Sequence, residues 1–413
     1  MRLKIRMSKL ENIKKQWKAI MSCMNCGDCG YAIRPAVGRF LTCPVKEAKG
    51  EEGWEIWFSR GRMSVLKNIL EGKLELNKDL AKYVYQCSEC GSCTEVCHQT
   101  HNPNIVLNTS KWIEHVEVWD ALRRDLVEAG FAPLEHHAKL IEYMNNPGMR
   151  NPYGESKEKK FEWVKEVKGL SKTSDVVFFA GCTEPLRQKE TLINLAKIFN
   201  AAGKEFSIID DEWCCGSIAL RIGDINSVKE NVEHNLEQIK KTGATKLFAA
   251  CAGCYRTIKK DWPDLIGEEL PFEVINITEM LLDLINDGSL KIPETNTEAI
   301  KVVYHDPCHL GRHMGLYDPP RDLIKKIPNT NLIELKRNRQ NAWCCGAGGG
   351  VKSEFSDLAL EIAKNRIDEV KETGINILLT ACPFCVGNLN DCVKIQNINI
   401  NVLDIIDYIA SKL

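Results

Sequence analysis

WCCG occupies residues 213–216 and recurs at residues 343–346. A single cysteine precedes each doublet and a C-x-x-C pair follows it. Each copy is therefore a set of five: Cys182, Cys214, Cys215, Cys251 and Cys254 in the first, and Cys308, Cys344, Cys345, Cys382 and Cys385 in the second. The gap between doublet and pair is 35 residues in the first copy and 36 in the second. Because the two sets are collinear, we infer that the C-terminal part of the chain is an internal duplication.

The segments around these cysteines alternate between two kinds of pattern. Apolar, β-prone runs deliver the first cysteine of each copy and each C-x-x-C pair: VVFFAGC (176–182), KVVYHDPC (301–308), LFAACAGC (247–254) and ILLTACPFC (377–385). Stretches of helical periodicity, 225–243 and 355–374, lie between them and end on glycine. Strands that alternate with helices predict an α/β fold with a mostly parallel sheet in each copy. The cysteines follow strand ends or lie in loops, so the five of one copy could converge on one site.

Eight further cysteines form two groups near the N-terminus: Cys23, Cys26, Cys29 and Cys43, then Cys87, Cys90, Cys93 and Cys97. The second group, CSECGSCTEVC, has the spacing of the bacterial ferredoxin run, whose fourth cysteine binds a different cubane from the first three. The first group opens in the same way, but thirteen residues (30–42) precede Cys43 and its Pro44. If the ligands cross over as in two-cluster ferredoxins, one cubane takes Cys23, Cys26, Cys29 and Cys97, and the other takes Cys43, Cys87, Cys90 and Cys93.

Other roles fit these thiols less well. Four cysteines can hold a structural zinc, but three within seven residues crowd a tetrahedral ion and suit the corners of a cubane. Structural disulfides are disfavoured by the spacing and by the lack of a recognisable secretory signal. One member of a doublet could be a small buried hydrophobic side chain, which is our interpretation of the remaining Cys392. GAGGG (346–350) lacks the spacing of a phosphate loop, so we interpret it as backbone that leaves room for a cluster or ligand.

Composition narrows the class of protein. The 413 residues carry a net charge of −1, with 44% hydrophobic and 27% charged residues, which favours a soluble globular protein of several domains over a nucleic-acid binder. No apolar window approaches the about 18 residues of a membrane span. Nineteen clustered cysteines indicate metal ligation in a reducing compartment. We expect a cytoplasmic protein and leave open its peripheral attachment to the cytoplasmic face of the membrane through a partner protein.

Together the motifs resemble those of the heterodisulfide reductases. The five-cysteine pattern is similar to the duplicated CCG domain of that family, and the chain from Cys23 onward resembles its D-type subunits, in which the C and B subunits of the soluble enzyme are fused. The likeness is closest in DDEWCCGS (210–217), ACAGCYRTIKKDWP (250–263), LPFEVINITEML (270–281), YHDPCHLGRHMG (304–315), WCCGAGGGVK (343–352) and ACPFCVGNLND (381–391). It implies a mainly α-helical ferredoxin-type domain with two [4Fe-4S] cubanes at 1–150. Two α/β CCG domains related by a pseudo-two-fold axis would follow at 170–295 and 298–413.

In that family each complete CCG domain binds a noncubane [4Fe-4S] cluster through its five cysteines, and both sets are complete here. The resemblance implies that the ten cysteines of the duplicated half are metal ligands and form the catalytic centre. The substrate would be the mixed disulfide of coenzymes M and B, reduced to two thiols between the two clusters in anaerobic methanogenesis. The cubanes would pass electrons from a membrane cytochrome b subunit or a soluble flavin subunit, within a hetero-oligomeric complex.

This substrate carries a sulfonate, a phosphate and carboxylates, so cationic side chains beside the cysteines are candidate ligands for it. The candidates are Arg221, Arg256, Lys259, His309, Arg312, His313 and Lys352. Solvated surface charge is an equally good interpretation of each one. His309 and His313 flank Cys308 and could also deliver protons, or hydrogen-bond to a cluster.

Two other functions stay open on the sequence alone. An electron-transfer subunit would relay electrons between a flavoprotein dehydrogenase and a membrane quinone pool, as do related subunits of glycolate and lactate oxidases. A related reductase would act on another disulfide or a trisulfide. Because motif cysteines can be replaced in the wider superfamily, the completeness of both sets favours bond-breaking chemistry over a relay.

Overall fold

The computed structural model describes residues 10–34, 38–50, 54–97, 113–294 and 298–413. The chain forms two compact units that are discontinuous in sequence. Unit 1 comprises Met1–Lys139, Ile218–Ile225 and Gln340–Arg366, and unit 2 comprises Leu140–Ser217, Asn226–Arg339 and Ile367–Leu413. Two segments of the duplicated half therefore belong to the unit that carries the N-terminal cysteines. The contiguous domains at 1–150, 170–295 and 298–413 remain a prediction.

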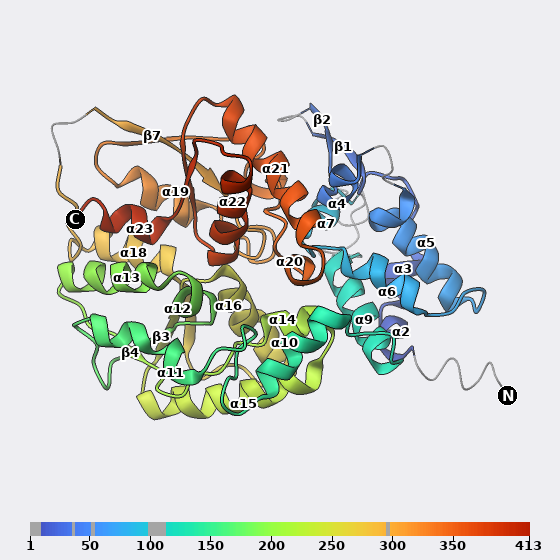
Figure 1. Ribbon diagram of the computed structural model, residues 1–413, viewed down its shortest axis with the longest axis horizontal. Coiled ribbons are helices and arrows are strands. Elements are labelled where there is room, and N and C mark those ends of the chain that lie inside the picture. The colour runs from blue at the N-terminus through green and yellow to red at the C-terminus, as the bar shows by residue number, and fades with distance from the viewer. Residues whose placement is uncertain (1–9, 35–37, 51–53, 98–112, 295–297) are drawn as a thin grey trace. The chain divides into compact units, whose positions relative to one another are not determined.

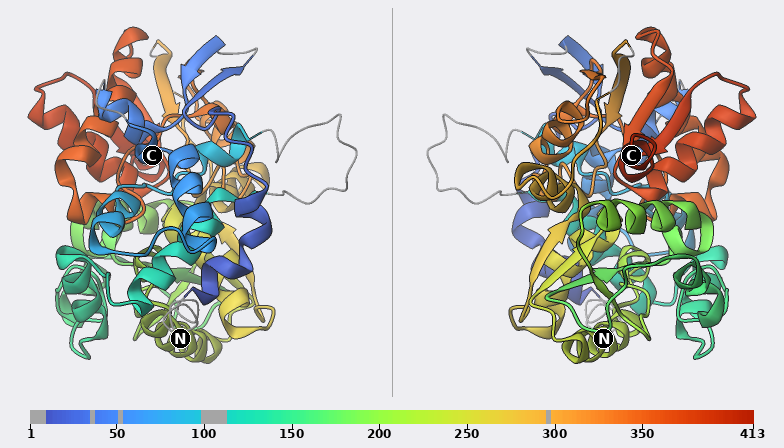
Figure 2. Two further views of the ribbon diagram at one scale, coloured as in Figure 1. Left: turned by 90° about the vertical axis from the view of Figure 1, so that its right-hand side faces the viewer. Right: turned by 90° about the vertical axis from the view of Figure 1, so that its left-hand side faces the viewer.

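Unit 2 contains two parallel sheets of four strands each, and both sheets have the same strand order. The first sheet runs β4-β3-β5-β6, with β3 (Val176–Phe179), β4 (Ser207–Ile208), β5 (Lys246–Ala249) and β6 (Glu273–Asn276). The second runs β8-β7-β9-β10, with β7 (Ile300–His305), β8 (Thr330–Ile333), β9 (Ile377–Thr380) and β10 (Asn401–Asp404). All neighbouring strands are parallel; Figure 2 shows the first half in green to yellow and the second in orange to red. The predicted duplication of a parallel α/β unit is confirmed.

Helices follow every strand in both halves, and Figure 1 labels many of them. The first half has α11 (Lys157–Lys160), α12 (Thr183–Arg187), α13 (Lys189–Ala201), α14 (Ser217–Ile222), α15 (Ile225–Thr242), α16 (Ala252–Arg256), α17 (Trp262–Ile266) and α18 (Ile277–Asn286), with a 3-10 helix at Glu162–Glu166 and a π-helix at Thr257–Asp261. The second half has α19 (Asp318–Lys325), α20 (Val351–Glu354), α21 (Ser356–Glu372), α22 (Pro383–Ile395) and α23 (Ile405–Ala410), with a 3-10 helix at Arg339–Asn341. Within the described ranges, no helix has the length and apolarity to cross a membrane.

The two halves of unit 2 pack through equivalent helices. α13 packs against α23, and α18 packs against α19. Since α13 and α19 come early in their halves and α18 and α23 close them, each half offers the same two helices to the other. Thr191 and Asn194 of α13 donate hydrogen bonds to Asp407 of α23 at 2.9 and 3.0 Å. Reciprocal contacts of this kind are those of a two-fold axis, here a pseudo-two-fold one.

The strands of unit 2 are apolar because helices cover both faces of a parallel sheet. Phe178 of β3 stacks on Phe248 of β5, with ring centroids 4.9 Å apart, and Phe199 of α13 stacks on the same ring at 5.3 Å. The second sheet uses fully buried aliphatic side chains instead: Val302, Val303, Leu378 and Leu379. The cysteines that follow these strands are thus anchored to close-packed cores.

Unit 1 is mainly helical, as expected. Its N-terminal part has α2 (Glu11–Lys15), α3 (Trp17–Met21), α4 (Pro44–Ala48), α5 (Ser59–Leu70), α6 (Lys78–Tyr85), α7 (Ser92–Glu95), α9 (His115–Glu128) and the start of α10 (Glu135–Asn145), with a 3-10 helix at Glu55–Trp57. Nearly all of α14, all of α20 and the first part of α21 also belong to this unit. Their core is built from Ile13, Met63, Leu66, Trp119 and Leu122, each at most 1% exposed. The insertion before Cys43 forms an antiparallel hairpin of β1 (Tyr31–Arg34) and β2 (Gly38–Leu41), which the sequence did not lead us to expect.

Candidate metal centres

The eight N-terminal cysteines line two separate cavities of unit 1. The first cavity is lined by Cys23, Cys26, Cys29 and Cys97, among other residues. The second is lined by Cys43, Cys87, Cys90 and Cys93, among others. Each cavity therefore gathers three cysteines of one run and the last cysteine of the other, which is the crossed arrangement of two-cluster ferredoxins.

The two cysteine loops share one backbone pattern. Asn25 and Gly27 follow Cys23 at two and four residues with φ of 56° and 94°, and Glu89 and Gly91 follow Cys87 at the same spacing with φ of 50° and 75°. Left-handed residues are uncommon outside glycine. Alternation of left-handed with ordinary residues is the backbone pattern of anion-binding nests. The repeated C-x-x-C-x-x-C spacing thus corresponds to a repeated local fold.

Burial disfavours the ionised form of three thiols in these cavities. Burial raises the pKa of Cys29 and Cys93 above the ordinary thiol value, and it raises the pKa of Cys43 to about 12. Such thiols are neutral at pH 7 by themselves and lose their protons when a metal binds. Grouped cysteines in nest-shaped loops are a donor set that fits iron–sulfur clusters.

All five cysteines of the first copy lie together in unit 2. Cys182 follows β3, Cys214 and Cys215 lie between β4 and α14, and Cys251 and Cys254 stand at the start of α16. Hydrogen bonds between thiols join Cys182 to Cys214, Cys214 to Cys215, Cys215 to Cys254 and Cys254 to Cys251. Every one of these side chains is buried. The fold therefore gathers residues that are up to 72 positions apart into one continuous group of sulfurs.

Side chains of neighbouring helices hold the first doublet in place. Asn235 of α15 accepts from Trp213 N at 2.9 Å and donates to Trp213 O at 3.2 Å, and Asn231 donates to Cys214 O at 3.2 Å. Trp262 donates from Nε1 to Cys215 O at 3.0 Å. These hydrogen bonds fix the main chain at both cysteines of the first doublet.

A buried ion pair supports the same loop. Lys160 Nζ lies 2.8 Å from Glu212 Oε1, and each side chain is 1% exposed. Glu212 Oε2 accepts a hydrogen bond from Ala180 N at 2.7 Å. Since Glu212 comes just before the doublet and Ala180 just before Cys182, one carboxylate ties together the backbone beside three of the five cysteines.

The cysteines of the second copy divide between the units. Cys308, Cys382 and Cys385 belong to unit 2, and Cys344 and Cys345 belong to unit 1. In unit 2 a thiol hydrogen bond joins Cys382 to Cys251, so the C-x-x-C pairs of the two copies meet. In unit 1 Cys344 Sγ donates to Ser88 Oγ at 3.5 Å. A doublet cysteine therefore contacts the loop that carries Cys87 and Cys90.

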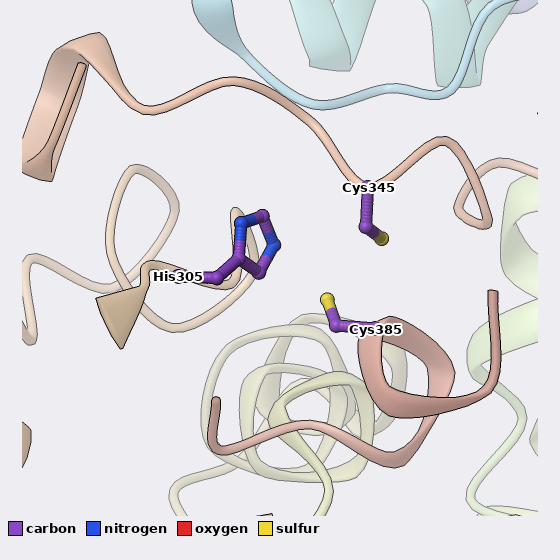
Figure 3. A group of neighbouring side chains, drawn as sticks. All are labelled: His305, Cys345 and Cys385. Carbon is purple, nitrogen blue, oxygen red and sulfur yellow. The ribbon is translucent and has the colours of Figure 1, made fainter. Parts of the chain in front are cut away.

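Sequence reasoning missed His305, at the carboxyl end of β7. A ring nitrogen of His305 and Sγ of Cys385 lie within 4.8 Å of each other, and both residues are buried (Figure 3). Figure 3 also draws Cys345, a residue of unit 1. The matched position in the first copy, three residues before its first cysteine, is Phe179. A histidine that ends an otherwise apolar strand was the signal available in the sequence.

Glu184, two residues after Cys182, was also missed. It is buried, and among the described residues no other residue hydrogen-bonds to its carboxylate oxygens. Burial raises its pKa well above the ordinary value, and the nearby Asp404 and Cys382 raise it further. Asp404, at the end of β10, accepts from Ile406 N at 2.9 Å and caps α23. Burial thus raises the pKa of both acidic side chains and disfavours their charged forms.

Three of the predicted substrate ligands are buried arginines. Arg221 forms an ion pair with Asp120 at 2.6 Å in unit 1. Arg256 forms one with Asp261 at 2.9 Å in unit 2. Arg312 is 8% exposed. The first two are thus already paired with carboxylates, and the role of all three toward a substrate remains a prediction.

The other predicted substrate ligands are more accessible. Lys259 is exposed and donates to Tyr255 Oη at 3.0 Å, and Lys352 of unit 1 is half-buried. His309 and His313 are half-buried, with ring centroids 4.7 Å apart. A Cβ added at Gly253 would lie 3.5 Å from Cys251 Sγ and 3.7 Å from His309 Nδ1. A histidine of the second copy therefore approaches the C-x-x-C loop of the first.

The segments that carry the two five-cysteine sets match a known domain family, and the whole chain is similar to known proteins. Residues 176–259 and 302–390 match the CCG cysteine-rich domain. The chain is 36% identical over 410 residues to the D subunit of the dihydromethanophenazine:CoB–CoM heterodisulfide reductase of Methanosarcina acetivorans, covering 95% of this chain and 93% of that protein. It is 30% identical to the B subunit of the fumarate reductase (CoM/CoB) of Methanothermobacter marburgensis, over 78% of this chain and 61% of that one.

Two more distant likenesses complete the comparison. The EtfAB:quinone oxidoreductase of Syntrophomonas wolfei is 27% identical over 93% of this chain and 57% of its own. A glutamate racemase structure from Bacillus anthracis covers 58% of this chain and 80% of its own, with 14% identity and a TM-score of 0.30, too low to bear on the fold. The match to the Methanosarcina protein, by contrast, spans the cysteine loops of unit 1 and both CCG domains. On that ground the chain belongs to the D-subunit family of the heterodisulfide reductases, which are iron–sulfur oxidoreductases.

Proposed function

We propose that this chain is the catalytic subunit of a heterodisulfide reductase, which reduces the mixed disulfide of coenzymes M and B to two thiols. The ten cysteines of the duplicated half would hold two noncubane [4Fe-4S] clusters, and the eight N-terminal cysteines two cubanes. Bound clusters supply single electrons, two of which are needed to cleave one disulfide.

The thiol contact between Cys251 and Cys382 carries this proposal. Two one-electron centres can act on a single S–S bond only if their ligand sets lie side by side. The pseudo-two-fold packing of α13 with α23 and of α18 with α19 supports this arrangement, because it joins the two halves within unit 2. Gly253 leaves space beside Cys251 and His309, at the junction of the two copies.

The contact between Cys344 and Ser88 supports an electron path from the N-terminal cysteines. Ser88 lies between Cys87 and Glu89 in the loop that lines the second cavity. A cluster held there would adjoin a ligand of the second CCG copy, at a distance set by contacts within unit 1. The cluster of the first cavity would then be the entry point from the donor.

The printed names of relatives support the substrate and the partners. The Methanosarcina protein is named for CoB–CoM heterodisulfide, and the Methanothermobacter protein for CoM and CoB. We infer a hetero-oligomeric complex in which electrons come from a membrane cytochrome b subunit or a soluble flavin subunit. Such a complex would be cytoplasmic, or peripheral on the cytoplasmic face of the membrane. Arg256, Lys259, His309, Arg312 and His313 of unit 2 are our candidates for the anionic groups of the substrate.

An anaerobic assay with reduced viologen dye and the coenzyme M–coenzyme B disulfide tests the proposal. Turnover by chain loaded with about sixteen irons, the stoichiometry of four [4Fe-4S] clusters, is expected. A fully loaded chain that does not turn over would overturn the assigned activity. Replacement of Cys344 by serine is expected to abolish turnover while both cubanes stay reducible.

The likeness to the EtfAB:quinone oxidoreductase favours one second candidate, an electron-transfer subunit that relays electrons toward a quinone. A chain of this kind would oxidise reduced viologen with a soluble quinone analogue as acceptor and leave the disulfide untouched. Completeness of both five-cysteine sets is why we place the reductase first. The same viologen assay, run with each acceptor in turn, separates the two functions, and a set of other disulfides and trisulfides tests a related reductase.

A further inference from the structure

We propose that Arg123 is a positioning residue that fixes the loop of the second cubane against the segments that follow both cysteine doublets. It would thereby set the rate at which electrons pass from that cubane into the two CCG copies. This inference rests on the proposed function, because it assigns a role to residues around clusters that the function requires. All of the contacts that support it lie within unit 1.

The guanidinium of Arg123 joins three segments of the chain. Arg123 lies on α9 and its side chain is fully buried. Nη2 donates to the carbonyls of Val84 and Cys87 at 3.1 and 2.8 Å, beside the cubane loop. Nη1 donates to Arg221 O at 2.6 Å and to Gly349 O at 2.9 Å. One side chain therefore binds the backbone of the cubane loop, of the segment 218–225 and of the segment 340–366.

Those two segments come directly from the doublets. Arg221 lies six residues after Cys215, and Gly349 lies four residues after Cys345. The fork of an arginine can hold several carbonyls at fixed angles, which the ammonium of a lysine cannot do. Arg123 thus relates the backbone of the cubane loop to both copies at once.

A buried charge network surrounds the guanidinium of Arg123. We call these charges, together with the hydrogen bonds of Arg123 to the three segments, the clamp. Glu89, which lies between Cys87 and Cys90, forms an ion pair with Arg123 at 2.8 Å, and both side chains are 0% exposed. Arg221 pairs with Asp120 at 2.6 Å and lies 3.9 Å from Glu89. Burying four charges carries a large desolvation cost, so such a network is poor evidence for stability and better evidence for defined positions. We assign Arg221 to this clamp rather than to the substrate.

Glycines allow the clamped backbones to touch. A Cβ at Gly223 would lie 2.7 Å from the carbonyl of Arg123, and a Cβ at Gly348 would lie 2.8 Å from Ser88 O. At Gly349 a Cβ would collide with the backbone of Cys87 and Ser88. Gly348 and Gly349 of the GAGGG segment therefore lie against the cubane loop. Their role here is close approach of backbone, as at other tight contacts.

The clamp matters for electron transfer because tunnelling rates fall exponentially with distance. Beside the clamp, a hydrogen bond runs from Cys344 Sγ to Ser88 Oγ at 3.5 Å. This bond links a ligand of the second CCG copy to the residue that follows a cubane ligand. A loosened clamp would lengthen the path without removing any iron ligand.

The test compares Arg123→Lys with Arg124→Lys, its half-buried neighbour on α9. Both variants keep their charge, and only the first loses the fork. After anaerobic mixing with reduced viologen, rapid freeze-quench electron paramagnetic resonance follows first the cubanes and then the CCG clusters. We expect Arg123→Lys to keep full iron and normal cubane reduction, and to slow reduction of the CCG clusters by about tenfold, the scale of outer-shell substitutions at metal sites. A rate equal to that of the wild type overturns the proposal.

A second variant covers the case in which Arg123→Lys fails to load its clusters. Asp120→Asn removes the charge that pairs with Arg221 and leaves Arg123 intact, so we expect slower reduction of the first CCG cluster alone. If the two CCG clusters of this variant are reduced at equal rates, the proposal is overturned. Neither measurement uses the disulfide, so the proposal for Arg123 can be overturned while the chain still reduces the substrate. The proposal can also be supported in a chain that does not reduce the substrate.

Discussion

A buried ion pair supports the backbone beside three of the five cysteines of the first copy. Lys160 and Glu212 are paired at 2.8 Å behind the first doublet, and Glu212 also accepts from Ala180 N. A lysine at this depth neutralises a carboxylate that has no access to water. The pair therefore couples the backbone beside Cys182 to the backbone beside Cys214.

We predict that Lys160→Met lowers the free energy of unfolding of unit 2 by about 3–5 kcal/mol, because it leaves a buried carboxylate unpaired. Chemical unfolding under anaerobic conditions measures this loss. Lys159→Met, which removes an exposed neighbour, is the control and should cost little. The double substitution Lys160→Met/Glu212→Gln should recover part of the loss. If Lys160→Met and Lys159→Met lower the free energy of unfolding by the same amount, the ion pair of Lys160 and Glu212 does not support the loop.

His137 makes unit 1 sensitive to pH. Burial lowers its pKa to about 4; its Nε2 lies 2.9 Å from Gly350 O, and no described residue hydrogen-bonds to its Nδ1. Because the folded state disfavours the imidazolium, the unfolded chain binds the extra proton between pH about 6.5 and pH about 4. Stability is then complete above pH about 6.5 and falls by at most about 1.4 kcal/mol per pH unit below it.

Unfolding at pH 7.5 and at pH 5.5 tests this dependence. His137→Gln should flatten the fall, since glutamine can donate to Gly350 O and does not titrate. His136→Gln, at the exposed neighbouring position, should keep the wild-type slope. An unchanged slope in His137→Gln would assign the pH dependence to other groups.

His305 makes the two sulfur groups chemically unequal. Its ring lies within 4.8 Å of Cys385 Sγ, whereas Phe179 at the matched position packs edge-on against Trp262 at 5.9 Å. A ring N–H near a cluster stabilises the reduced, more negative form, as hydrogen bonds to cluster sulfurs do. We predict that His305→Phe lowers the midpoint potential of the second CCG cluster by roughly 40 mV, about 1 kcal/mol for one electron.

Redox titration followed by electron paramagnetic resonance measures that potential, with the two cubanes as internal references. His305→Gln keeps an N–H donor and should stay near the wild-type value. A potential that is the same in all three proteins would exclude a hydrogen-bonding role for His305.

At the scale of elements, the strands and the long helices of the duplicated half were predictable, whereas the clamp on α9 was not. VVFF and ILLT are recognisable as buried strands because local apolarity and β-branching decide such segments. The hairpin β1-β2 was not predicted, since its residues carry no alternating pattern. Arg123 gave no signal either, because its partners are main-chain carbonyls from three segments that only the tertiary fold brings together.

The junction of 218–225 with α9 depends on one glycine. Gly223 has φ of 98°, and a Cβ there would lie 2.7 Å from the carbonyl of Arg123. Gly374, after α21, has φ of 70° and nothing within 4 Å of an added Cβ. Alanine carries backbone strain at both positions because φ is positive, and it collides with α9 at Gly223 alone. We predict that Gly223→Ala costs about 1–3 kcal/mol more than Gly374→Ala in chemical unfolding. Equal costs would mean that the segment does not need to lie so close to α9.

At the scale of the whole molecule, duplication and discontinuity serve different ends. Duplication supplies two five-cysteine sets whose C-x-x-C pairs meet through Cys251 and Cys382 in unit 2. Discontinuity assigns a segment from each copy to unit 1, with the N-terminal cysteines. The cysteine spacing predicted the duplication, because a repeat is visible along the chain. The spacing could not predict that a segment of each copy belongs to unit 1, since no local sequence pattern indicates which unit a short segment joins.

The division of labour between the two kinds of cysteine set is open to a direct measurement. Cys251→Ser removes a sulfur that hydrogen-bonds both to Cys254 and to Cys382. Of about sixteen irons per chain, we expect this variant to lose about four, or about eight if the second CCG cluster depends on the same contact. The two reduced cubane signals should persist, because their cysteines line separate cavities in unit 1. Cys392→Ser, which replaces the buried cysteine outside every group, is the matched control and should keep all of its iron. Full iron in Cys251→Ser would mean that the C-x-x-C pairs are not cluster ligands, whereas loss of the cubane signals would mean that the two kinds of set do not form independently.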